Sequence, residues 1–119
     1  MADECDIPPA PLFKALKAGE VLLVDVREPA EFANERIHGA LLHPLSTFEP
    51  QAIPTDGARR VIFQCGSGKR SRQALDAFVS ATGVDAAHMA GGIGAWKSAG
   101  LPLIRINPAT GQVEDDGRY

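Results

Sequence analysis

Short apolar runs alternate along this chain with segments of helical pattern, and this alternation constrains the fold more than any other feature. The runs are rich in aliphatic and β-branched residues, and they are too short for helices, which favours strands buried on both faces. The strongest candidate is 61–65. The predicted strands are 21–26, 40–43, 61–65 and 86–90.

Helical patterns separate these strands, and proline or glycine marks several of their ends. In 71–82, Ala74, Leu75 and Phe78 share one face, and Gly83 follows as a stop signal. The predicted helices are 11–17, 29–32, 71–82 and 93–99. Strands that alternate with helices pair in parallel, so the sequence predicts an α/β fold with a central, mostly parallel sheet of about five strands flanked by helices on both faces.

Bulk properties limit the class of protein. A length of 119 residues suits one domain with one hydrophobic core. A net charge of −3 provides no overall basic field, so we expect no nucleic-acid partner. The longest apolar runs, 21–24 and 40–42, are too short to span a bilayer, and the N-terminus lacks a signal pattern. We therefore expect a cytoplasmic protein with no membrane partner.

The chain has two cysteines, Cys5 and Cys65, which are too few for a disulfide framework. No Cys/His cluster has zinc-ligand spacing, so we expect no metal site. Cys5 lies in a polar N-terminal segment and is interpreted as an incidental exposed thiol. Cys65 is then either an inert core residue or a reactive thiol.

Cys65 ends the strongest predicted strand, and ligand sites in parallel sheets form beyond the carboxyl ends of strands. The residues after it are Gly66, Ser67, Gly68, Lys69, Arg70 and Ser71. The glycines let successive backbone N–H groups point inward as an anion-binding nest, and the following helix dipole adds to that field. Lys69, Arg70 and Arg72 add full charges. Such surroundings lower the pKa of a thiol, which favours a nucleophilic role for Cys65 over an inert one.

Three segments carry a family resemblance. Residues 65–71 read CGSGKRS; residues 23–28 read LVDVRE, with EF at 31–32 and IHGA at 37–40; residues 89–96 read MAGGIGAW. In this order they resemble the active-site loop, the first strand with the turn into the second, and the late Gly-Gly turn and helix of rhodanese-homology domains. They cover most of residues 6–104, which we take as the domain. Residues 105–119 are predicted to form a C-terminal tail or a small hairpin.

The resemblance implies a sulfurtransferase with Cys65 as the catalytic nucleophile. The thiolate takes sulfane sulfur from a small anionic donor, such as thiosulfate or a persulfide. The Cys65 persulfide then passes its terminal sulfur to cyanide, a thiol or a protein acceptor. Residues 66–71 form the anion-binding loop, in which Arg70, and after it Lys69, orients the donor. This chemistry requires no metal and no organic cofactor.

Other functions stay open at this point. A cysteine phosphatase or arsenate reductase generally places arginine six positions after the cysteine, whereas Arg70 is at the fifth position and Ser71 at the sixth. A non-catalytic rhodanese-like module for binding or regulation typically lacks the cysteine or an intact loop. A sulfur relay to another protein would use the same residues. The donor is also open, because CGSG resembles mercaptopyruvate-using relatives and KRS resembles thiosulfate-using ones.

Charged residues follow the first buried strand. We interpret Asp25, Arg27 and Glu28 as a charge network that fixes the loop, with Asp25 and Arg27 as candidate supporting residues of the site. Asp25 is also a candidate to orient Arg70.

Histidines complete the list of candidate groups. His38, His43 and His88 are assigned no catalytic role, because an ionised Cys65 needs no general base. Trp96 is interpreted as a core anchor.

Overall fold

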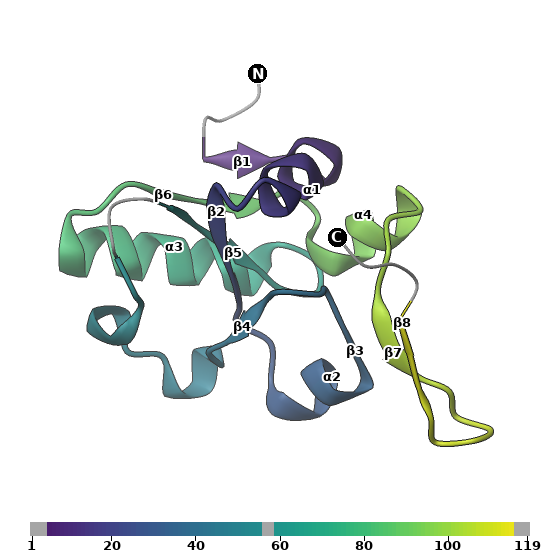
Figure 1. Cartoon of the computed structure of the whole chain (residues 1–119). Helices are drawn as coiled ribbons and strands as arrows, with labels where there is room; N and C mark the ends of the chain where they lie inside the picture. The colour runs from purple at the N-terminus through teal and green to yellow at the C-terminus, as the bar shows by residue number, and fades with distance from the viewer. Residues whose placement is uncertain (1–4, 56–58, 116–119) are drawn as a thin grey trace.

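The computed structural model describes residues 5–55 and 59–115, so the end of the predicted tail, 116–119, lies outside the described residues. Five strands form a parallel sheet in the order β1-β6-β5-β2-β4 (Figure 1). Their bounds are Asp6–Ile7 for β1, Ala86–Met89 for β6, Arg60–Gln64 for β5, Val21–Asp25 for β2 and Leu41–Leu42 for β4. The predicted α/β class and the mostly parallel sheet are confirmed.

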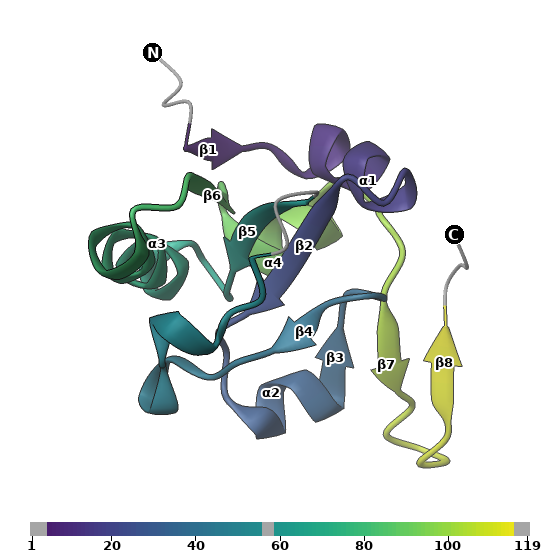
Figure 2. The same ribbon diagram turned by 60° about the vertical axis from the view of Figure 1, so that its left-hand side comes forward.

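Helices cover both faces of this sheet (Figure 2). On one face α3 (Lys69–Thr82) packs Phe78 against Phe63 of β5, with ring centroids 5.4 Å apart. On the other face α1 (Pro9–Lys17) and α4 (Gly92–Ser98) bury Leu12 and Trp96 against Ile62. Neighbouring residues of β5 thus point to opposite cores, which explains why its sequence is apolar throughout.

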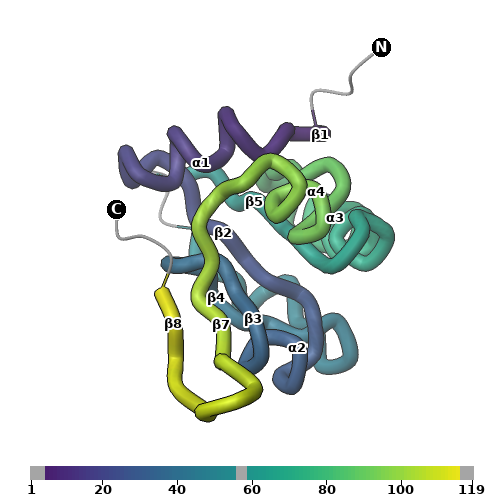
Figure 3. The backbone as a smooth tube through the Cα atoms, turned by 90° about the vertical axis from the view of Figure 1, so that its right-hand side faces the viewer, coloured from purple at the N-terminus to yellow at the C-terminus, as the bar shows by residue number. Residues whose placement is uncertain are grey.

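A second, antiparallel sheet was not predicted. It pairs β3 (Glu35–Arg36), β7 (Ile104–Ile106) and β8 (Val113–Asp115), and Figure 3 shows β7 and β8 side by side. The turn between β7 and β8 is closed by a hydrogen bond from Gly111 N–H to the Asn107 carbonyl, 2.7 Å long. Of the two alternatives for the C-terminal segment, the structure has the hairpin. These strands are short and none of their residues is fully buried, so their sequences show no clear alternation of apolar and polar residues.

The start of α3, beside the candidate site, differs from the sequence prediction. The helix predicted over 71–82 begins at Lys69, because Gly68 adopts φ +106° at the N-cap. Lys69, Arg70 and Ser71 therefore lie in the first helical turn, and the loop proper is only 66–68. Short 3₁₀ turns at Leu45–Thr47 and Pro50–Ala52 follow β4. Within the described ranges, no helix is long and apolar enough to cross a membrane.

The start of α4 rests directly on the end of β5. Ile93 N–H donates to the Cys65 carbonyl at 2.7 Å, and Gly94 N–H donates to the Gly66 carbonyl at 3.2 Å. Gly92 has φ +60°, and a Cβ there would lie 2.2 Å from the Cys65 carbonyl oxygen. The Gly91-Gly92 pair thus allows a backbone approach that no other residue type permits.

We expect Gly92→Ala to destabilise the fold by more than about 3 kcal/mol, because the added methyl displaces either α4 or the Cys65 carbonyl. Gly100→Ala is the matched control: its φ is +74°, but a Cβ there meets nothing within 4 Å. Its cost should be the conformational one alone, about 1–2 kcal/mol. Urea unfolding of both variants measures the difference, and equal losses would contradict this account of the contact.

Candidate active site

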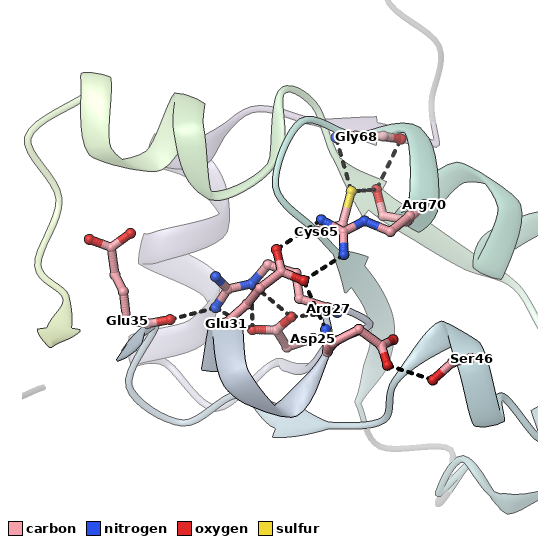
Figure 4. A network of polar contacts seen from close by, with 10 residues as sticks. Asp25, Arg27, Glu31, Glu35, Ser46, Cys65, Gly68 and Arg70 are labelled. Carbon is pink, nitrogen blue, oxygen red and sulfur yellow. Dashed lines mark hydrogen bonds and ion pairs between the residues drawn. The ribbon is translucent and has the colours of Figure 1, made fainter. Parts of the chain in front are cut away.

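The Cys65 sulfur lies beneath the loop that follows β5 (Figure 4). The residue has no exposed surface. Its Sγ accepts a hydrogen bond from Gly68 N–H at 3.0 Å and lies 3.6 Å from the Ser71 hydroxyl oxygen. The predicted anion-binding loop is thus folded around the sulfur itself, with its donors aimed at the position where a thiolate charge would sit.

Burial and hydrogen bonding act in opposite directions on the thiol. Burial raises the pKa of Cys65, but hydrogen bonds from the Ser71 hydroxyl and from the backbone N–H groups of Ser71, Gly68 and Ser67 together lower it, and the net shift is downward. The positive end of the α3 dipole points at the same atom. The site therefore stabilises the thiolate, the form in which cysteine attacks.

Arg70 is held by a carboxylate from α2 (Pro29–Asn34). Its Nη1 and Nη2 donate to Glu31 Oε1 at 2.7 Å and Oε2 at 3.1 Å, as Figure 4 shows. Hydrogen bonds from Arg70 lower the pKa of Glu31 to about 2 despite partial burial. Glu31 is itself fixed, because its Oε1 accepts Glu28 N–H in the capping box of α2. The bidentate pair sets the plane of the guanidinium.

Asp25 and Arg27 form a separate, buried pair. Arg27 donates to the Asp25 carboxylate through Nε at 3.1 Å and Nη2 at 2.9 Å, and Nη2 also donates to the Glu35 carbonyl at 2.6 Å. These contacts tie the end of β2 to β3, which fits the interpretation as a charge network. The side-chain hydrogen bonds drawn in Figure 4 for Arg70 go to Glu31, whereas Asp25 acts on Arg70 through its charge, so an orienting role for Asp25 stays a prediction.

His88 lies beside the Cys65 loop, although the sequence analysis assigned it no role there. Its Nδ1 lies 2.9 Å from the Ser71 hydroxyl oxygen, and its Nε2 lies 2.5 Å from Asp6 Oδ1. The side chain is buried in β6, one strand away from Cys65. No spacing rule could find this contact, because Asp6 and His88 are 82 positions apart and meet only through the pairing of β1 with β6.

A hollow of about 720 Å³ opens beside the loop. Ser67, Gly68 and Lys69 line it together with Asp6 and His88. Lys69 is exposed here, on the outer side of the loop, whereas Arg70 points toward α2.

Cys5 is half-buried and packs against the core, which corrects its interpretation as an exposed thiol. In the part of the chain that the structure describes, no three His, Cys, Asp or Glu side chains gather closely enough to hold a metal ion.

Comparison with known proteins shows which family this chain resembles. The family model described as Rhodanese-like domain matches residues 9–99. An uncharacterized protein of Synechocystis sp. is 39% identical over 103 residues, which cover 87% of this chain and 58% of that protein. A protein of Allochromatium vinosum named "Sulfurtransferase" is 40% identical over 87 residues, which cover 71% of this chain and 79% of that protein. The chain thus spans little more than half the length of the first of these relatives.

Solved structures share the fold. The solution structure of a rhodanese-like domain from Anabaena sp. matches with a TM-score of 0.75 over 98% of this chain and 92% of that domain, at 24% identity. The likeness extends across the whole arrangement of sheet and helices described above.

Ser71→Ala should raise the pKa of Cys65 by about one unit, because a hydrogen bond to a charged group contributes about 1.5–3 kcal/mol and 1.4 kcal/mol corresponds to one unit. Alkylation by iodoacetamide should then slow near neutral pH and stay unchanged in strong base. Peptide mass spectrometry separates Cys65 from Cys5 in this assay. Ser67→Ala removes the exposed hydroxyl of the same loop and should leave the pH midpoint of Cys65 alkylation unchanged. If both variants shifted this midpoint equally, the specific role of Ser71 would be contradicted.

Proposed function

This chain belongs to the rhodanese-like domain family, and from that premise we propose that it is a sulfurtransferase that carries sulfur as a persulfide on Cys65. The observation that supports this most is the Cys65 sulfur itself, which accepts Gly68 N–H under an intact loop. A non-catalytic module has no need of a cysteine in surroundings that lower its pKa.

The first half-reaction loads the sulfur. The Cys65 thiolate attacks the outer sulfur of thiosulfate, the S–S bond of the donor breaks, and sulfite leaves with the bonding electron pair. The Sγ–S bond forms at the same time. Loop N–H groups of the kind that hold the thiolate stabilise the negative charge of the resulting persulfide, as an oxyanion hole does for an acyl intermediate.

The second half-reaction returns the enzyme to its starting state. A nucleophilic acceptor, cyanide or a thiolate, attacks the terminal sulfur, and the Sγ–S bond breaks with its electrons returning to Cys65. No electrons are gained or lost by the protein over the cycle. Neither half-reaction needs a general base at the sulfur if the thiolate is already formed.

Access to the sulfur involves Arg70. Because Cys65 has no exposed surface, a donor reaches Sγ only when side chains over the loop move. The Arg70 side chain lies against Gly66, where Nη2 would be 3.2 Å from an added Cβ, and it is 36% exposed. We propose that the guanidinium meets the anionic donor, which then competes with Glu31 for its N–H groups.

The partners follow from this chemistry. We propose thiosulfate or a persulfide as the sulfur donor and cyanide, a thiol or a protein as the acceptor. The cytoplasmic location stays a prediction.

The direct test is the intact mass of the protein after incubation with thiosulfate, with Cys65→Ser beside it. We expect the wild-type chain to gain one sulfur atom at Cys65 and to lose it to cyanide as thiocyanate, while the variant gains nothing there. If Cys65 gains no sulfur from thiosulfate, mercaptopyruvate or glutathione persulfide, the proposed sulfurtransferase activity is refuted. A non-catalytic rhodanese-like binding module would then be the better interpretation. Turnover of an aryl phosphate or of arsenate would instead favour the phosphatase or reductase chemistry.

Arg70→Ala should weaken the use of thiosulfate about tenfold or more in kcat/KM, because the doubly charged donor loses the cation that binds it, and should affect a singly charged alkyl persulfide less. Arg60→Ala is the matched control. Arg60 begins β5 at the amino end of the sheet and pairs there with Asp85, so its loss removes the same charge far from the site. Equal effects of the two variants on thiosulfate would refute donor binding by Arg70.

A further inference from the structure

A chain of hydrogen-bonding groups leads from the Cys65 sulfur to the protein surface. Ser71 Oγ lies 3.6 Å from Sγ and 2.9 Å from His88 Nδ1, and His88 Nε2 lies 2.5 Å from Asp6 Oδ1. Cys65, Ser71 and His88 are buried, while the Asp6 side chain is 39% exposed. Asp6 and His88 also line the hollow beside the loop. The inner end of the chain is thus the nucleophile and its outer end meets solvent.

The direction of the hydrogen bonds is fixed at the outer end. An ionised carboxylate can only accept, so His88 Nε2 donates to Asp6. In the neutral imidazole, Nδ1 is then the acceptor and takes the hydroxyl proton of Ser71. The Ser71 oxygen is left to accept from the Cys65 thiol. This arrangement joins a nucleophile, a base and an orienting carboxylate through one hydroxyl group.

We infer that His88, oriented by Asp6, is a positioning residue for the nucleophile: through the Ser71 hydroxyl it takes up the proton that Cys65 gives up. The Sγ–H proton passes to Ser71 Oγ while the hydroxyl's own proton passes to His88 Nδ1. The products are a thiolate and an imidazolium, with no net change in charge or in the number of protons. Ser71 then donates to the thiolate, and His88 Nδ1–H donates to Ser71.

The Ser71 hydroxyl has a competing acceptor, which explains why a base behind it matters. Ser71 Oγ also lies 3.1 Å from the Gly68 carbonyl, and a hydroxyl has one proton to donate. A neutral imidazole accepts the Ser71 proton at Nδ1, so the hydroxyl then has no proton to donate to Sγ. His88 in its protonated form leaves the Ser71 proton available to the sulfur.

Charged groups around His88 come from several elements. Asp6 on β1 stabilises the imidazolium, and the Cys65 thiolate, one residue beyond β5, does so through Ser71. Lys69 and Arg72 of α3 line the same hollow and oppose the positive charge. Both cations are exposed to solvent, which screens them, whereas Asp6 is in direct contact with Nε2.

This inference deepens the proposed function, because persulfide chemistry needs the thiolate, but its test needs no sulfur donor. The rate of Cys65 alkylation by iodoacetamide is measured from about pH 5 to pH 10, with peptide mass spectrometry as the readout. We expect His88→Gln to raise the midpoint by about one pH unit or more, so that alkylation slows about tenfold near pH 6 and is unchanged near pH 10. Asp6→Asn should shift the midpoint in the same direction by a smaller amount.

Two controls separate this role from a structural one. His38→Gln, at a half-exposed histidine outside the site, should leave the profile unchanged. The double variant Ser71→Ala/His88→Gln should have the midpoint of Ser71→Ala alone, because His88 acts through that hydroxyl. An unshifted midpoint, a uniform loss of rate at every pH, or additive shifts in the double variant would each overturn the inference.

If His88→Gln does not fold, the Asp6→Asn variant provides the test, since it keeps the buried imidazole in place. An unshifted pH midpoint of Cys65 alkylation in Asp6→Asn overturns the inference. The protein could show alkylation of Cys65 that depends on His88 and yet gain no sulfur from any donor. That result would support the proton transfer to His88 and refute only the proposed sulfurtransferase function.

Discussion

The Cys65 sulfur is buried in surroundings that lower its pKa, and the rest of this structure depends on how that buried charge is stabilised. Moving an anion out of water costs several kcal/mol even after the protein relaxes, so the charge is stable only where donors replace the lost water. Gly68 N–H and the Ser71 hydroxyl are such donors at Cys65, each contributing about 1.5–3 kcal/mol. The short loop, the start of α3 and the close packing of α4 all serve to bring these groups to one atom.

The two carboxylate–arginine pairs near the loop have different surroundings and therefore different uses. The pair of Asp25 and Arg27 is buried, and Arg27 Nη2 also donates to the Glu35 carbonyl, so the pair fixes the end of β2 to β3. The pair of Arg70 and Glu31 is more than one third exposed on both sides. Solvent therefore reaches both side chains, and the proposed donor anion would compete with Glu31 for the N–H groups of Arg70.

The core of the fold could be predicted because its signals are local. β2 and β5 are apolar on both faces, and α3 has its apolar residues on one side, so period and length alone identify them. Of the second sheet, the sequence suggested only a hairpin after residue 104, as one of two alternatives, and β7 and β8 form it. The addition of β3 could not be predicted, because β3 is two residues long and pairs with β7, which is distant in sequence. The start of α3 was predicted two residues late, since Gly68 rather than a side chain caps it.

By itself the sequence determined the α/β class and singled out Cys65 and the loop after it as the candidate site, because a strand end, two glycines and three cationic residues stand within a few positions of one another. Only the tertiary structure decided which groups complete the site. Glu31 reaches Arg70 across 39 positions, and Asp6 reaches His88 across 82. Such contacts follow from the order in which strands pair and helices cover the sheet, and no local propensity or spacing encodes them.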